Sequence, residues 1–215
     1  GFAGLFTYDP ARPVKSADLA PMLDTLWYRG PDGAGELVED GLGLGFRRLA
    51  IIDVEGGRQP MPNEDGTVWV VQNGEIYNYR ELAADLAGRG HRFATRSDTE
   101  VVVHAYEEWG DRCVERLRGI FAFALWDRRR RRLLLARDRS GIKPLNIAFQ
   151  RDRIAFASEA KALLALPRMD RRLDLLGYLG GAATDPDLAR TAFDGILQLG
   201  AGCTLAATAE GYRVE

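Results

Sequence analysis

The sequence predicts an α+β domain in which strands outnumber helices. Short runs of alternating or β-branched residues recur along the 215 residues. Helix-start signals appear at only a few points among them, without the regular strand–helix alternation of a doubly wound parallel sheet. Hydrophobic residues make up 46% of the chain and charged residues 28%, which is typical of a globular domain and not of a disordered one.

The predicted strands are recognised by residue pattern. In residues 41–46 large side chains occupy every second position, with glycines on the other face. Residues 67–72 are β-branched and aromatic, which favours a buried strand. Large and small side chains alternate through residues 120–126. Further strands are expected at residues 2–8, at 133–136, and as two short strands within 196–214 around Gly200 to Gly202.

Five consecutive arginines, Arg128 to Arg132, follow Asp127 between two of these strands. They could form a patch for nucleic acid or phosphate, or the solvated tip of a hairpin. No aromatic residue interrupts the run, and the formal net charge of the chain is −2. Both facts favour the hairpin tip and give no reason to expect nucleic acid as a partner.

Capping patterns mark two helix starts. Asn78 to Glu81 precedes Leu82 and Leu86, and glycines then end the helix. Ser97 to Glu100 is a fuller capping box, and its helix runs to Gly110. A third helix is expected over residues 159–166, followed by a connecting segment over 173–192.

Composition also excludes some classes of protein and site. No apolar run approaches 18 residues, and the first ten residues lack the pattern of a secretory signal, so we expect a cytoplasmic protein with no membrane partner. Cys113 and Cys203 are too few for a disulfide framework. His91 and His104 leave little for a zinc site, so no metal is expected in this domain.

Seven segments in order along the chain carry a specific pattern. They are Arg29-Gly30-Pro31-Asp32-Gly33, Arg48-Leu49-Ala50-Ile51-Ile52-Asp53, Asn73-Gly74-Glu75-Ile76-Tyr77-Asn78, Ser97-Asp98-Thr99-Glu100-Val101, Phe121-Ala122-Phe123-Ala124-Leu125-Trp126-Asp127, Arg137-Asp138-Arg139-Ser140-Gly141-Ile142-Lys143-Pro144-Leu145 and Ala157-Ser158-Glu159-Ala160-Lys161-Ala162-Leu163. Together they resemble the N-terminal glutaminase domain, a class II glutamine amidotransferase domain, of glutamine-hydrolysing asparagine synthetases.

That resemblance implies a fold and a domain organisation. The expected fold is the αββα sandwich of N-terminal-nucleophile hydrolases, two stacked antiparallel sheets between helical layers. Residues 1–165 would form the glutaminase domain, and 166–215 a connecting segment and closing strands leading to a synthetase domain. No Ser-Gly-Gly-x-Asp-Ser loop occurs in the sequence, so the expected ATP and Mg²⁺ belong to that synthetase domain and no cofactor to this one.

The resemblance also implies a site for L-glutamine. Arg48 occupies the family's position for the substrate carboxylate, which suits a planar guanidinium, helped by backbone groups of Leu49 and Ile51. Asp98 and Glu75 occupy positions that face the substrate ammonium. Asp98 could equally serve its helix start, and Glu75 could be an exposed residue in the turn after a strand.

Asn73 and Gly74 match the family's oxyanion donors. Amide hydrolysis passes through a tetrahedral oxyanion, which an asparagine amide and a backbone N–H can stabilise. Alone, Asn-Gly after a strand would be interpreted as a hairpin turn. Followed by Glu-Ile-Tyr-Asn, it is interpreted as the oxyanion turn. The segment Arg137 to Leu145 either shapes the inner end of this pocket and the exit for ammonia or is a structural loop.

The nucleophile of the family is a cysteine expected immediately before Gly1, with its own α-amine as the base. Cys113 and Cys203 stand in contexts unsuited to replace it. Either the cysteine precedes Gly1, or the protein lacks it and the domain is a non-catalytic scaffold, as in β-lactam synthetases. The intact pocket favours the first.

An amidophosphoribosyl-type or glucosamine-phosphate-type amidotransferase fits the segments less well. The resemblance also allows a homodimer and does not fix the acceptor acid, for which aspartate is the default.

Overall fold

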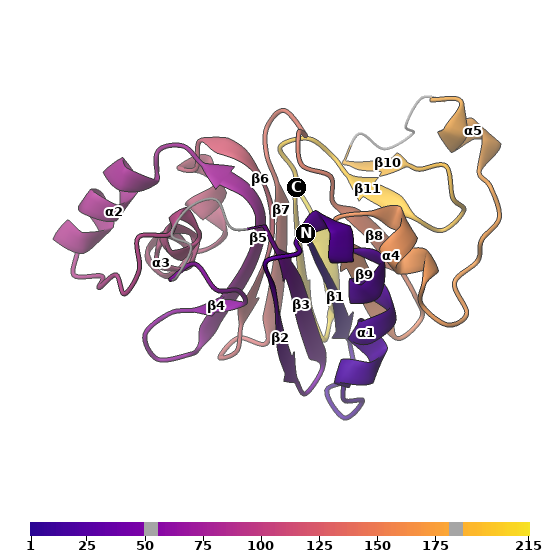
Figure 1. Cartoon of the computed structure of the whole chain (residues 1–215), viewed down its shortest axis with the longest axis horizontal. Helices are drawn as coiled ribbons and strands as arrows, with labels where there is room; N and C mark the ends of the chain where they lie inside the picture. The colour runs from indigo at the N-terminus through magenta and orange to yellow at the C-terminus, as the bar shows by residue number, and fades with distance from the viewer. Residues whose placement is uncertain (50–55, 181–186) are drawn as a thin grey trace.

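Two antiparallel sheets stacked face to face form the centre of the molecule, which a computed structural model describes for residues 1–49, 56–180 and 187–215 (Figure 1). In spatial order the first sheet comprises β10 (Leu188–Arg190), β11 (Leu197–Leu199), β8 (Asn146–Phe149), β9 (Arg153–Ala157), β1 (Phe2–Thr7), β3 (Leu42–Arg48) and β2 (Gly33–Glu39). The second comprises β13 (Gly211–Val214), β12 (Thr204–Thr208), β7 (Arg132–Arg137), β6 (Gly119–Asp127), β5 (Val68–Ile76) and β4 (Met61–Pro62).

Helices cover the outer face of each sheet (Figure 1). The first sheet carries α1 (Ser16–Thr25) and α4 (Ala160–Leu164), and the second carries α2 (Tyr79–Gly88) and α3 (Asp98–Trp109). The shorter pieces are α5 (Leu175–Tyr178) and two 3-10 turns at Trp27–Arg29 and Gly110–Glu115. The result is four layers, helix–sheet–sheet–helix, and it confirms the fold expected from the sequence.

Strand alternation explains why both faces of each sheet are apolar. In β1, Phe2 and Phe6 enter the core between the sheets, whereas Ala3 and Leu5 enter the core beneath α1 and α4. The same period of two places the small side chains and the tryptophan of β6 between the sheets and its phenylalanines against α3. Three stacked hydrophobic cores follow from this one pattern.

The predicted helix starts are correct in position but differ in their capping contacts. Ser97 caps α3 through its Oγ, which accepts a hydrogen bond from the Thr99 N–H at 3.2 Å. The Glu100 carboxylate turns back to the N–H groups of Ala94 and Thr95, so the capping box is incomplete. Asn78 stands at the start of α2 without capping it, because its amide binds backbone groups of residues 116 and 118.

Several elements of the fold were not predicted, among them α1, β2, β8 and β9. α1 contains Pro21 in its interior, where proline removes a backbone donor, so its residues carry no clear helix signal. It is held by its buried side chains Leu19, Met22 and Leu23. In the closing region, three strands replace the predicted two over residues 196–214, and β10 lies in the predicted connecting segment. These strands extend both sheets.

The arginine run is a hairpin tip, as predicted. β6 and β7 pair up to Asp127 and Arg132, and the residues between them form the turn. Four of the guanidiniums make ion pairs with carboxylates, namely Arg128 with Glu39, Arg129 with Asp65, Arg130 with Asp127 and Arg132 with Asp111. Among the described residues, no helix is long and apolar enough to cross a membrane.

Candidate active site

A cleft of about 240 Å³ lies where the ends of β3 and β5 meet the start of α3. Six of the seven predicted site residues line it: Arg48, Leu49, Asn73, Gly74, Glu75 and Asp98. The seventh, Ile51, lies outside the described residues. Gly1, which directly precedes β1, also lines the cleft. Residues from positions 1 to 143 of the chain are thus gathered around one small space.

Asn73 and Gly74 lie within β5, where they pair with Ala122 and Phe121 of β6. The predicted turn at this point is therefore wrong, because the strand continues to Ile76. Gly74 has a φ of +136°, and a Cβ placed there would lie 2.0 Å from the Ile120 carbonyl oxygen. Only glycine fits at this position. The strand pairing, and not a turn, holds the two residues at the cleft.

The amide nitrogen of Asn73 is buried and has no hydrogen-bond partner among the described residues. A buried donor without a partner costs roughly 1–3 kcal/mol. Because Asn73 lines the cleft, a group bound there could accept this hydrogen bond. The strand therefore presents an unused donor to the cleft.

Asp98 is the first residue of α3 and is 5% exposed. Its Oδ2 accepts hydrogen bonds from Gln72 Nε2 and from the Ile76 N–H, both at 2.9 Å. Burial raises the pKa of this carboxyl above its usual range, the nearby Glu75 carboxylate raises it further, and the two hydrogen bonds oppose the shift. A cation placed beside Asp98 would favour the charged form.

Gln72 and Arg29 also line the cleft and were not among the predicted site residues. Gln72 orients Asp98 and was visible in the sequence only as the end of a predicted strand. Arg29 begins one of the seven segments, and its Nη1 lies 2.5 Å from Glu159 Oε1. Its buried Nε has no hydrogen-bond partner among the described residues, and its side chain packs against Gly1.

Lys143 places the segment from Arg137 to Leu145 at the cleft wall. The segment is also an ordered loop, since the Asp138 carboxylate accepts hydrogen bonds from three of its backbone N–H groups, those of Ser140, Ile142 and Lys143. The loop therefore lies at the pocket and is also held in place by its own hydrogen bonds, so the two alternatives from the sequence do not exclude each other.

Neither cysteine lines the cleft. Cys113 is buried in the core between α3 and the second sheet, and this burial raises the pKa of its thiol to about 12. Cys203 is packed between the two sheets. A thiol with so high a pKa is a poor nucleophile near neutral pH.

The charges at the cleft suit a zwitterion. Arg29, Arg48 and Lys143 supply positive charge, and Glu75 and Asp98 supply negative charge. A ligand with a carboxylate and an ammonium could pair with both kinds of group, leaving the remainder of the cleft for an uncharged polar end. An α-amino acid with an amide side chain has this set of groups.

Comparison with known proteins agrees with this chemistry. The family model described as "Glutamine amidotransferase domain" matches residues 1–215. Asparagine synthetase [glutamine-hydrolyzing] 3 of Bacillus subtilis is 42% identical over 82% of this chain and 29% of that protein. The asparagine synthetase [glutamine-hydrolyzing] of Zea mays is 48% identical over 70% of this chain and 25% of that protein.

A solved structure supports the fold independently. The glutamine phosphoribosylpyrophosphate amidotransferase of B. subtilis superposes with a TM-score of 0.71 over 100% of this chain and 48% of that one, at 20% identity. The chain spans between a quarter and a third of the length of the two synthetases.

Proposed function

This chain belongs to the glutamine amidotransferase domain family, and we propose that it hydrolyses L-glutamine to glutamate and ammonia. The ammonia would pass to a synthetase domain of the same protein, as the names of the similar asparagine synthetases suggest. The observation that carries the proposal is the convergence of Arg48, Asp98 and the Asn73 amide, which has no partner in the described part of the chain, on one cleft.

Each end of glutamine has a partner in this scheme. The Arg48 guanidinium binds the α-carboxylate as a planar fork. Asp98 and Glu75 face the α-ammonium, whose charge compensates for the burial of Asp98. The side-chain carbonyl then lies against the Asn73 amide and the Gly74 N–H, which stabilise the oxyanion as the carbonyl carbon becomes tetrahedral.

The nucleophile in this proposal is a cysteine joined to the nitrogen of Gly1, at the cleft wall. Its thiolate attacks the amide carbon, and its α-amine carries the proton to the departing nitrogen, which leaves as ammonia. Water then hydrolyses the thioester, releasing glutamate and restoring the thiol.

The competing proposal is a non-catalytic scaffold that supports a synthetase domain and lacks the cysteine. Two versions of the full-length protein separate these functions, one with cysteine before Gly1 and one with alanine there. We expect glutamate release from glutamine only in the first, with ammonia formed in equal amount. A cysteine version that folds normally with its synthetase domain in place yet releases no glutamate would refute the glutaminase proposal.

Asn73→Ala tests the oxyanion donor. The loss of one such donor typically lowers kcat by about 10²–10³, so we expect that reduction in glutamate release with a much smaller change in KM. Asn78→Ala is the control, because the Asn78 amide binds backbone groups of residues 116 and 118 and does not line the cleft. An equal loss of kcat in both variants would contradict the assignment.

The remaining properties of the whole protein are part of the same proposal. ATP and Mg²⁺ serve the synthetase domain, whose acceptor is aspartate by default, and the protein acts in the cytoplasm, with a homodimer as the proposed assembly. Steady-state assays with ATP, glutamine and a panel of acidic acceptors would identify the product, and light scattering would give the assembly.

A further inference from the structure

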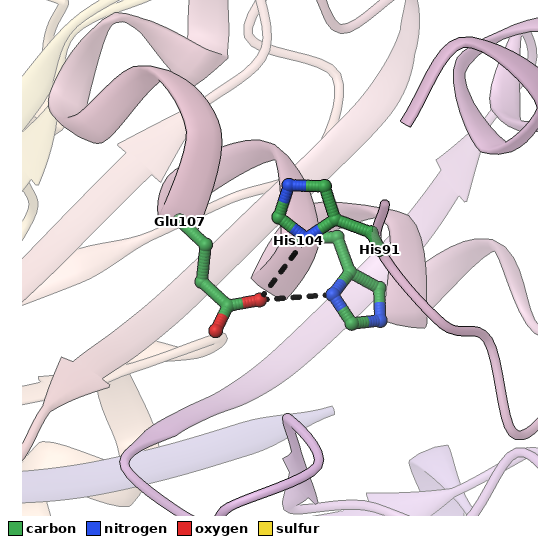
Figure 2. Close-up of side chains that lie close together, drawn as sticks. All are labelled: His91, His104 and Glu107. Carbon is green, nitrogen blue, oxygen red and sulfur yellow. Dashed lines mark hydrogen bonds and ion pairs between the residues drawn. The ribbon is translucent and has the colours of Figure 1, made fainter. Parts of the chain in front are cut away.

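A cluster of histidine and glutamate side chains lies on the outer helical layer, away from the cleft. His91 follows the end of α2, and His104 and Glu107 lie on α3 (Figure 2). None of the three lines the cleft. Two histidines alone predict no metal site, but the fold brings both imidazoles together, with ring centroids 5.2 Å apart.

The donor atoms have spacings that suit a single ion. One carboxylate oxygen, Glu107 Oε2, lies 2.9 Å from His104 Nδ1 and 3.6 Å from His91 Nδ1, and Figure 2 shows both imidazoles approaching it. Donor atoms from the three residues lie within 4.8 Å of one another. Tetrahedral Zn²⁺ with bonds of about 2.0–2.1 Å needs donors about 3.4 Å apart.

Acceptors outside the cluster face the far side of both imidazoles. Glu108 Oε2 lies 3.3 Å from His91 Nε2, and Glu100 Oε1 lies 3.7 Å from His104 Nε2. Metal-binding imidazoles commonly direct their second nitrogen to a carboxylate in this way. His104 Nε2 is otherwise a buried atom without a hydrogen-bond partner among the described residues.

The third donor is oriented as well. Asn63 Nδ2 donates a hydrogen bond of 2.6 Å to Glu107 Oε1, which leaves Oε2 directed at the two imidazoles. The backbone also fixes the histidines: the His91 N–H bonds the Leu86 carbonyl at the end of α2, and residues 104 and 107 share one face of α3. These restraints reduce the reorganisation that binding would require.

Charge and access favour a cation. Glu64 Oε2 lies 3.9 Å from His104 Nδ1, so four carboxylates, those of Glu64, Glu100, Glu107 and Glu108, surround two imidazoles. Arg89 pairs with Glu108 at the outer edge. The His104 side chain is 1% exposed, whereas His91 and Glu107 are 16% and 25% exposed, which gives an ion a route from solvent.

We propose that His91 Nδ1, His104 Nδ1 and Glu107 Oε2 bind a divalent transition-metal ion, for which Zn²⁺ is the best match. Two imidazoles and one carboxylate are a common three-ligand zinc set, and Glu64 or water takes the fourth position. The ion fastens the segment after α2 to α3. The site is separate from glutamine hydrolysis and does not depend on that activity.

Metal binding is measured on the full chain after treatment with a chelator. Isothermal titration calorimetry with zinc, and metal analysis after gel filtration, should each give one equivalent of zinc per chain. Bound zinc should also raise the melting temperature. Co²⁺ should give the visible absorption of a four-coordinate ion without the near-ultraviolet bands of thiolate ligation, which separates this site from binding at Cys113 or Cys203. A chain that takes up no zinc in the titration and retains none after gel filtration would overturn the proposal.

Variants locate the ion. Glu107→Gln keeps an oxygen for Asn63 but weakens the ligand, and His91→Ala removes a partly exposed imidazole; each should lower zinc affinity at least about 10-fold. Glu81→Gln is the control, because Glu81 lies in the first turn of α2, at the end of that helix away from His91. It should bind zinc as the parent does. Circular dichroism verifies folding. Undiminished zinc binding in both ligand variants would show that the ion binds elsewhere, and the histidines would then only be ion-paired with their carboxylates.

Discussion

Two adjacent arginines at the end of β3 have different environments. Arg47 donates a hydrogen bond from Nε to the Leu23 carbonyl at 3.2 Å and pairs with Asp24, so it holds α1 to the sheet. Arg48 lines the cleft. The sequence presents the same residue twice, and only strand alternation separates the structural side chain from the proposed substrate-binding one.

This difference gives a matched pair of variants. Lysine keeps the charge but loses the planar fork, so Arg48→Lys should raise the KM for glutamine by roughly 10-fold or more, the loss of about 1.4 kcal/mol. Arg47→Lys should leave KM near the parent value. Steady-state glutamate release measures both, and equal KM values in the two variants would contradict the role of Arg48.

Glycines 74 and 88 form a second pair. A Cβ at Gly74 would lie 2.0 Å from a backbone oxygen, so Gly74→Ala should lower the free energy of unfolding by about 1–3 kcal/mol or more. Gly88 ends α2, and no atom of the described residues lies within 4 Å of such a Cβ, so Gly88→Ala should stabilise the protein by about 0.5–1 kcal/mol. Urea unfolding measures both signs. An unchanged free energy of unfolding in Gly74→Ala would mean that β5 can move away from β6.

At the scale of elements, the loop between β7 and β8 is held by Arg137. Its guanidinium donates hydrogen bonds to three backbone carbonyls, those of Lys143 at 2.9 Å, Leu199 at 2.6 Å and Gly141 at 2.5 Å. One side chain thus ties the loop that carries Lys143 to the first sheet. A planar group with five donors can do this, and an ammonium cannot match its geometry.

Arg137→Lys should therefore destabilise the protein by about 1–3 kcal/mol, since partly buried carbonyls lose their donors. Hydrogen exchange should quicken at residues 139–143. Arg139→Lys is the control, because Arg139 lies in the same loop with one exposed hydrogen bond to the Glu115 carbonyl. If exchange in the loop rises equally in both variants, Arg137 is not its main restraint.

Elements with a local signal were predictable from the sequence. Ser97 followed by Glu100 marks the start of α3, and the alternation in residues 120–126 marks β6. α1 was not predictable, because Pro21 contradicts a helix and only packing against the first sheet overrides it. The turn at Asn73 failed for a similar reason: a local turn pattern is overridden by pairing with β6, which is distant in sequence.

The residues of the candidate site are predictable from the family pattern, whereas the residues that orient them are not. Arg48, Asn73 and Asp98 stand in recognisable segments, and the fold brings them to one cleft. Gln72, which orients Asp98, carries no signal of its own, because its role depends on a contact with a residue 26 positions away. Side chains that orient a site residue, as Gln72 does, are brought to it by tertiary packing, which local residue patterns do not specify.

At the scale of the whole molecule, Glu159 joins segments that are 130 residues apart in the chain. It follows β9 and contacts Arg29 at 2.5 Å and Lys161 at 3.1 Å, with a further hydrogen bond from Tyr28. Burial alone would raise the pKa of the Glu159 carboxyl, but the bonds from Tyr28, Arg29 and Lys161 outweigh it and lower that pKa to about 2.

A lowered pKa in the folded state stabilises the protein at pH values above the unfolded pKa of 4.5, and this stabilisation is lost as the pH falls toward about 2. We therefore expect Glu159→Gln to be less stable than the parent above about pH 5, and this difference to be lost as the pH falls through about 2. Urea unfolding at several pH values measures it. A difference that is constant with pH would show that the ionised form of Glu159 contributes nothing to stability.

The arginine tip between β6 and β7 also affects how the protein meets proteases. Five consecutive sites for a trypsin-like enzyme occur here, four of them at exposed arginines. The strands leading to them lie in the interior of the second sheet, with partners on both sides. Cleavage requires an extended stretch of chain to leave the fold. The rate of digestion at this tip should therefore be limited by local unfolding of the central strands, although the tip holds many cleavage sites.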